Sequence, residues 1–307
     1  MPLRAGHAAK VRIDYSNNSV PPAPPFRADL HLGYAPPDGR IAAAVRAARR
    51  ADVAVVFANT IGGETMDQSS LALPGDQDAL VEAVAKANRN TVVVLHTGGP
   101  VLTPWRSRVA AIVEDWYPGE RSGDAIARVL FGDVDPSGRL PLTFPASAAQ
   151  GPATRASEFP GTGGVADHDE GLDVGYRFYD AHGQRPAFPF GFGLSYTSFR
   201  LGRAKATGAA GAYAVSVPVR NTGRRPGTQT VQVYASFAKA AGEPPRRLVG
   251  FAQVTVPPGQ TRTAKLTTDP KSFQVFDAGT GAYALPAGPI GLAVGTSSRA
   301  LTPVAVG

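Results

Sequence analysis

Hydrophobic and polar residues alternate with two different periods over residues 39–146. The Ala- and Arg-rich stretch from Ile41 to Arg50 predicts a helix, and the continuous apolar run at 52–58 predicts a strand covered on both faces. Acidic residues in the first turn and apolar residues along one side predict another helix from Asp76. The same patterns predict strands at 91–96 and 110–114 and a helix at 124–131. This order predicts an α/β sandwich domain with a mostly parallel sheet and helices on both faces.

The pattern changes after residue 146. Residues 147–171 are rich in Gly, Ala, Ser and Pro and show no period, which predicts a linker or long loop. Residues 172–307 contain short alternating segments separated by turns, with strands expected at 213–220, 228–237, 247–256, 261–267 and 290–295. Their even spacing predicts an all-β, immunoglobulin-like sandwich of about seven strands.

The first 38 residues form a separate segment. Lys10 to Tyr15 and Phe26 to Tyr34 alternate like strands, with a turn at Asn17-Asn18-Ser19 between them. Two strands cannot bury a core alone. Residues 1–38 are therefore expected to be the end of a module whose remainder lies outside this chain.

Composition narrows the function classes. The 307 residues carry a formal net charge of +7, but Arg residues are scattered singly or in pairs such as Arg49-Arg50, with no basic helix. This distribution is typical of a solvated surface, and no nucleic-acid partner is expected. No run approaches membrane length and Met1-Pro-Leu-Arg lacks a signal-peptide core, so neither a membrane segment nor a signal peptide is expected. The absence of Cys excludes disulfides and thiolate metal sites and leaves the compartment open, cytoplasmic or secreted.

The main candidate site is the polar loop at 62–77, between a predicted strand and a predicted helix. Ligands bind outside the carboxyl ends of strands in open α/β sheets, so Glu64 in this loop is the first candidate for chemistry. The alternative is an ordinary solvent-facing acid. Asp67 is either a substrate contact or a cap or turn acid before the next helix.

Other candidate residues favour structural roles. Trp105 and Trp116 stand near element ends, where a core position is favoured over sugar stacking. His96 is expected to satisfy a loop carbonyl, with lining of a cleft as the alternative. The remaining His residues are dispersed, so no metal site is predicted. Gly62-Gly63 and Gly98-Gly99 follow strands, but the Gly-x-Gly-x-x-Gly pattern and the Walker lysine are missing, which argues against nucleotide binding.

Several separate blocks of sequence resemble one enzyme family. The blocks are Glu64 to Gln77, His96 to Trp105, Trp116 to Glu120 and Leu130 to Pro145. They closely resemble the C-terminal half of glycoside hydrolase family 3 enzymes, the β-glucosidase group. Glu170 to Asp180 and Phe188 to Phe199 resemble that family's entry into its fibronectin type III-like domain. Residues 1–38 are similar, more weakly, to the end of the PA14 module of some members.

The resemblance implies a retaining β-glycosidase that hydrolyses terminal β-linked sugars without a metal or organic cofactor. Such enzymes use an Asp nucleophile on a preceding (β/α)₈ barrel and a Glu acid/base in the α/β domain. Glu64 falls where many members place that Glu. Asp67 matches a family Asp that is usually followed by Arg, whereas Gln68 follows here.

The resemblance also implies that the chain is incomplete. It shows no barrel repeat and no matching nucleophile, so these residues alone are expected to be inactive, and a barrel on the same polypeptide and a glycoside are the expected partners. Should they act alone, Asp67 or Asp115 would be the first nucleophile candidates. A flavodoxin-like binding module, or a structural or carbohydrate-contacting accessory module, stays open as the alternative.

Overall fold

A computed structural model describes residues 39–64 and 67–307. Ile41–Gly307 forms one compact unit. The segment 1–38, expected to be the remnant of a PA14-like module, lies outside the described residues.

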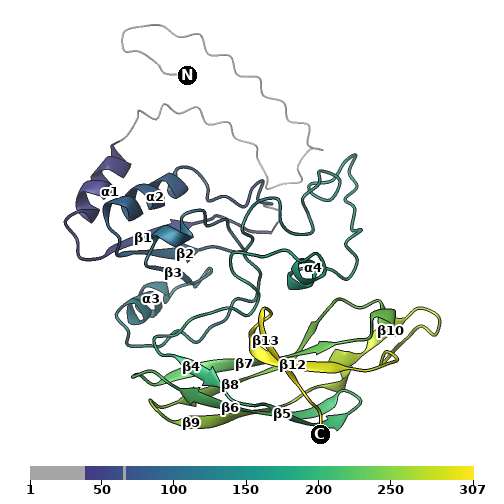
Figure 1. The fold of residues 1–307 in the computed structure, drawn as a ribbon. Coiled ribbons are helices and arrows are strands. Elements are labelled where there is room, and N and C mark those ends of the chain that lie inside the picture. Colours follow the sequence, from purple (N-terminus) through teal and green to yellow (C-terminus); the bar gives the residue numbers. More distant parts are fainter. Residues whose placement is uncertain (1–38, 65–66) are drawn as a thin grey trace. The chain divides into compact units, whose positions relative to one another are not determined.

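The first part of this unit is an α/β layer structure (Figure 1). Its sheet has the order β1-β2-β3 and is parallel throughout. The strands are β1 Ala54–Asn59, β2 Thr91–His96 and β3 Ala111–Glu114, and the helices are α1 Arg40–Ala48, α2 Gln77–Ala87, the short 3-10 helix η1 Arg106–Arg108 and α3 Ser122–Leu130. Asn59 pairs with His96, and Leu95 pairs with Glu114. All three strands therefore end at the same edge, where the candidate loop begins.

The core of the α/β part lies between the sheet and the helices α1 and α2. Val81 of α2, Val93 of β2 and Trp105 are fully buried there. The indole nitrogen of Trp105 donates to the Asp78 carboxylate at 2.7 Å, which satisfies the one polar atom of this large side chain. The expectation that Trp105 belongs to the core is confirmed.

The strand β1 differs from its prediction because only one of its faces is covered. Its residues alternate between buried and exposed, and Val55 and Phe57 are 42% and 48% exposed. The strand lies at the edge of the sheet, and α3, which lies on the other side of the sheet from α1 and α2 in Figure 1, follows β3 at the far edge. A continuous apolar run therefore did not distinguish a strand covered on both faces from an edge strand.

The second part is an all-β sandwich, as predicted. One sheet has the order β13-β12-β7-β8, the other has the order β4-β6-β5 with β9 also paired to β6, and β10 and β11 form a separate hairpin. The strands are β4 Phe199–Leu201, β5 Lys205–Ala209, β6 Ala212–Asn221, β7 Gly227–Ser236, β8 Arg247–Val256, β9 Thr261–Thr267, β10 Val275–Asp277, β11 Ala282–Ala284, β12 Gly291–Ser297 and β13 Ala300–Val304; two short 3-10 helices are η2 Lys239–Ala241 and η3 Pro270–Phe273. Alternating residues such as Val217, Val219, Val231 and Val233 fill the space between the sheets.

One helix was not predicted. The helix α4 spans Tyr176–Ala181, inside the region expected to contain strands only. No side chain caps its first turn, and six residues are too few for a stable isolated helix. Tertiary contacts hold it instead, since the fully buried Asp180 carboxylate is paired with Arg246 and Arg299 of the sandwich.

The two parts of the unit are joined by polar contacts around Asp135. Its Oδ1 accepts hydrogen bonds from the Ser195 hydroxyl and the Tyr196 amide, both at 2.7 Å. Its Oδ2 accepts from the Thr228 amide at the start of β7, at 3.3 Å. Arg225 adds a bond from its guanidinium to the carbonyl of Gly132 at 2.8 Å. The sandwich is therefore attached to the α/β part by several hydrogen bonds as well as by the chain itself.

Candidate functional site

The site is built at the carboxyl edge of the three parallel strands. The loop from Thr60 to Asp76 leaves β1 at this edge and carries Glu64 and Asp67, both of which are exposed. Gln77, the first residue of α2, ties the two ends of the loop together. Its amide nitrogen donates to the carbonyls of Asn59 and Pro74, each at 2.9 Å, and its amide oxygen accepts from the Asn59 amide at 2.8 Å.

Gln68 makes a hydrogen bond within this loop. Its side-chain nitrogen donates to the carbonyl of Ile61 at 2.7 Å. This bond ties Gln68 to the backbone shortly before Glu64. Asp67 lies nine residues before Asp76, the N-cap residue of α2, so it is not the cap of that helix.

Tyr117 links the loop to the other two strands. Its hydroxyl lies 2.9 Å from the Thr60 hydroxyl and 3.2 Å from the Thr60 carbonyl, to which it donates. The Thr60 hydroxyl also accepts from the amide of Gly98, at 3.4 Å. Residues that follow β1, β2 and β3 therefore meet at one phenol group. Sequence reasoning did not single out Tyr117, although its place directly after a parallel strand was a usable signal.

Glu114, the last residue of β3, is a half-buried acid behind this link. Its carboxylate accepts from the Trp116 amide at 3.0 Å and lies 3.1 Å from the Thr97 hydroxyl. Burial raises the pKa of Glu114 to about 7, against the opposing effect of these hydrogen bonds. The Thr97 hydroxyl has a single hydrogen, and both the Glu114 carboxylate and the carbonyl of Gly99, at 2.8 Å, lie within reach of it as acceptors.

Asp115 and His96 form a pair next to Glu114. The ring nitrogen Nδ1 of His96 lies 2.7 Å from a carboxylate oxygen of Asp115, and the ring stacks on Phe57. Burial raises the pKa of Asp115, and the nearby His96 opposes this shift. The expected partner of His96, a loop carbonyl, is wrong, because the ring nitrogen pairs with the Asp115 carboxylate instead. The two residues are neighbours because Leu95 of β2 pairs with Glu114 of β3, so the ends of these parallel strands lie side by side. Trp116 is half-buried and packs edge-on against Phe144, as expected for a core position.

Glu114 should make stability depend on pH in a defined direction. Its pKa is higher in the folded chain than the ordinary value near 4.5, so folding takes up a proton between about pH 4.5 and pH 7. Stability is therefore expected to fall as pH rises through this window, by at most about 3 kcal/mol and by less where solvent reaches the carboxyl. Urea unfolding of Glu114→Gln across this range should show a flatter dependence.

The matched control for this experiment is Glu82→Gln. Glu82 is an acid of the same domain in an exposed ion pair with Arg108, and its replacement should leave the slope unchanged. Equal slopes for Glu114→Gln and the unmodified chain would contradict the assignment.

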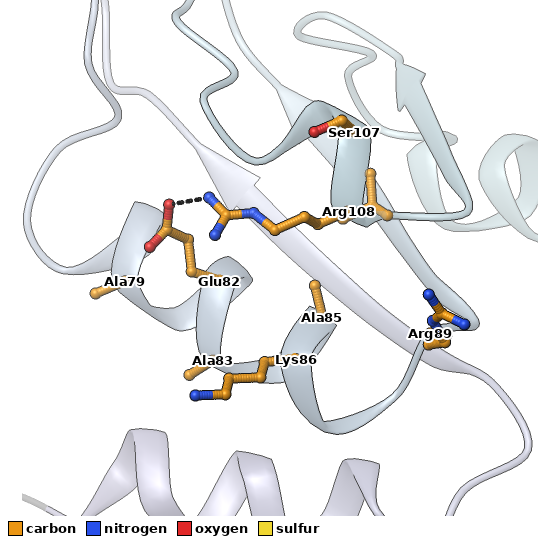
Figure 2. Close-up of a pocket in the computed structure, with 9 residues that line it drawn as sticks. Ala79, Glu82, Ala83, Ala85, Lys86, Arg89, Ser107 and Arg108 are labelled. Atoms are coloured by element: carbon orange, nitrogen blue, oxygen red, sulfur yellow. Dashed lines mark hydrogen bonds and ion pairs between the residues drawn. The ribbon is translucent and has the colours of Figure 1, made fainter.

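A groove of about 880 Å³ lies elsewhere on the α/β part. Figure 2 shows it between α2 and the turn η1, with the carboxylate of Glu82 paired to the guanidinium of Arg108 at 2.6 Å. Lys86 and Arg89 also line it, and no lining residue belongs to the Glu64 loop.

Within the described residues, no group of three His, Asp or Glu side chains is arranged to hold a metal ion. None of the helices there has the length and apolarity needed to cross a bilayer.

The chain is thus an α/β domain followed by an all-β sandwich. The loop that carries Glu64 and Asp67 lies at the carboxyl edge of the parallel sheet. The family model described as the glycosyl hydrolase family 3 C-terminal domain matches residues 6–196, and the fibronectin type III-like domain model matches residues 229–298. The chain therefore belongs to glycosyl hydrolase family 3.

Curated relatives and solved structures that match this chain are glycosidases. A β-glucosidase of Rhizobium radiobacter is 41% identical over 280 residues, which cover 88% of this chain and 34% of that protein. An exo-α-(1→6)-L-arabinopyranosidase of Bifidobacterium breve is 36% identical and is covered to 37%. The crystal structure of the Streptomyces venezuelae β-glucosidase DesR in complex with D-glucose superposes with a TM-score of 0.82 at 41% identity, covering 85% of this chain and 34% of that one. The chain spans about a third of the length of the curated relatives it matches.

Proposed function

We propose that this chain is the C-terminal portion of a retaining β-glycosidase and supplies Glu64 as the general acid/base. The observation that supports this most directly is the position of Glu64. It is exposed on a loop that is tied at both ends, at the carboxyl edge of a parallel sheet, in a chain of this family. The (β/α)₈ barrel and its Asp nucleophile would come from the remaining two thirds of the protein.

In this proposal Glu64 acts twice. It first protonates the glycosidic oxygen as the leaving group departs, while the nucleophile forms a covalent bond to the sugar. It then removes a proton from the water that cleaves this glycosyl-enzyme bond. The two carboxyl groups must lie roughly 5–5.5 Å apart for this pathway. The exposure of Glu64 in the present unit is compatible with it, because a barrel docked over the loop would exclude water and favour the protonated acid.

The proposed substrate is a terminal β-linked glucoside. This choice is supported by the relatives and solved structures that the chain matches, most of which are β-glucosidases. The Bifidobacterium breve relative makes an α-L-arabinopyranoside the second substrate to test. Asp67 remains a proposed substrate contact, and its exposed position on the same loop as Glu64 supports this role. The end of a PA14-like module at 1–38 remains part of the proposal, on the strength of a weak resemblance alone, and the family 3 model already begins to match at residue 6.

The proposal is tested by assaying the 307-residue chain with and without a cognate family 3 barrel on activated aryl β-glucosides and α-L-arabinopyranosides. The chain alone is expected to show no turnover, because one carboxyl group can neither form the glycosyl-enzyme bond nor hold the sugar. The complemented protein is expected to hydrolyse one of the two substrates. Activity of the chain alone would place a nucleophile within these residues. Inactivity of the folded, barrel-containing protein on every glycoside would favour a non-catalytic carbohydrate-contacting or structural module.

A further inference from the structure

The side chain of Tyr117 packs closely against the backbone of the two neighbouring loops. A Cβ placed on Gly98 would lie 2.6 Å from its Cε2 and 3.0 Å from its Cζ, and a Cβ placed on Gly62 would lie 3.1 Å from its hydroxyl. The ring therefore lies directly against the backbone of two glycines. These glycines lie in the loops that follow β2 and β1.

The backbone before Tyr117 is held in an uncommon conformation. Trp116 has a φ of 59°, a left-handed conformation that costs a bulky non-glycine residue on the order of 1–3 kcal/mol. The Glu114 carboxylate accepts the Trp116 amide hydrogen at 3.0 Å, and the Trp116 ring packs against the core. These contacts hold the turn that directs Tyr117 back across the sheet edge toward Thr60.

The hydroxyl of Tyr117 acts on the segment that leads to Glu64. Its two contacts are both to Thr60, which precedes Glu64 by four residues, and the Thr60 amide donates to the carbonyl of His96 at 3.1 Å. Gln68 restrains the next residue, Ile61, through its carbonyl. The start of the loop is thus fixed from three sides before it reaches Glu64.

We infer that Tyr117 is a positioning residue that fixes the base of the Glu64 loop through Thr60, with Gly98 and Gly62 as the glycines that make room for its ring. The inference rests on the proposed function, since it assigns Tyr117 to the same reaction. Tyr117 itself is not assigned a contact with the sugar. Its role is to keep the carboxyl of Glu64 where proton transfer to the glycosidic oxygen is possible.

Two variants disturb the contact between Tyr117 and Thr60 in independent ways. Tyr117→Phe removes only the hydroxyl, and Gly98→Ala forces the ring away without altering Tyr117. The matched controls are Gly99→Ala, where nothing lies within 4 Å of the added Cβ, and Tyr283→Phe on the exposed strand β11. All four variants are first compared in thermal unfolding, so that only folded chains enter the comparison.

The first measurement is hydrogen exchange in the 307-residue chain, followed in peptides that contain Thr60 to Glu64. Loss of the Tyr117 bonds should speed exchange there about tenfold in Tyr117→Phe and Gly98→Ala, with no change in either control. This measurement does not depend on activity. Exchange at the unmodified rate in Tyr117→Phe would overturn the inference even if Gly98→Ala failed to fold.

The second measurement is turnover by the barrel-containing protein on two glycosides that differ in their leaving group. A misplaced acid should lower kcat/KM, which reports formation of the glycosyl-enzyme, about tenfold for a poor alkyl leaving group and less than about threefold for an activated dinitrophenyl group, which departs without protonation. A smaller folded fraction would lower both equally, and that result would overturn the positioning role. If the loop loosens but Glu64→Gln leaves turnover unchanged, the proposed function fails, and the positioning role of Tyr117 in the reaction fails with it. If the loop is unchanged in Tyr117→Phe, only the role of Tyr117 is rejected.

Discussion

Replacing Glu64 by Ala in the barrel-containing protein is expected to lower turnover of alkyl glycosides by roughly 10²–10⁴-fold, the range of general acid–base catalysis. The loss should be smaller for formation of the glycosyl-enzyme from a dinitrophenyl glycoside, because that leaving group needs no proton. Its hydrolysis by water should remain slow, since no base activates the water. Stopped-flow measurement of a burst followed by a slow steady state would detect this separation of the two steps.

Azide provides a sharper test of the same residue. It is a nucleophile that needs no general base, so it should accelerate the steady state of Glu64→Ala and form a glycosyl azide. Asp52→Asn is the matched control, since Asp52 is an exposed acid at the opposite end of β1 from the loop. Full activity of Glu64→Ala on alkyl glycosides would show that the acid/base lies elsewhere.

Much of the fold could be predicted because hydrophobic periodicity is strong in both domains. The predicted bounds of β2, β8 and β9 agree with those in the structure. The prediction missed the helix α4, whose Asp180 pairs with Arg299, a residue far away in the sequence. It also missed the exposed face of β1, because a strand's own residues do not show what lies over it.

The candidate site shows a similar limit. The Glu64 loop could be located from a strand, a polar segment and a helix, together with the family resemblance. The contacts of Tyr117 with Thr60 and of Asp115 with His96 depend on the register of three parallel strands. Register is a tertiary property, so spacing along the chain does not reveal it. The rule that parallel strands end at a common edge would have grouped these residues as neighbours.

Replacing Asp180 by Ala is expected to cause the largest loss of stability among the polar substitutions considered. Its carboxylate is fully buried and lies 3.2 Å from Nε of Arg246 and 3.0 Å from Nε of Arg299. Removing it leaves two partly buried guanidinium groups without their anion, at a cost of about 3 kcal/mol, the lower end for broken buried pairs. Arg299 retains bonds to the carbonyls of Tyr179 and Gln184, which moderates the loss.

This loss can be measured by thermal unfolding and separated from packing effects by a mutant cycle. A decrease of about 3 kcal/mol should lower Tm by roughly 6–12 °C for a unit of this size. Arg121→Ala, which breaks an exposed ion pair with Asp124, is the matched control and should change Tm by less than about 2 °C. Removing Asp180, Arg246 and Arg299 together should cost less than the sum of the single changes, because no unpaired charge remains. Additive losses would show that the three groups are not coupled, and α4 would then be held by the packing of Tyr176 on Phe190 rather than by its buried acid.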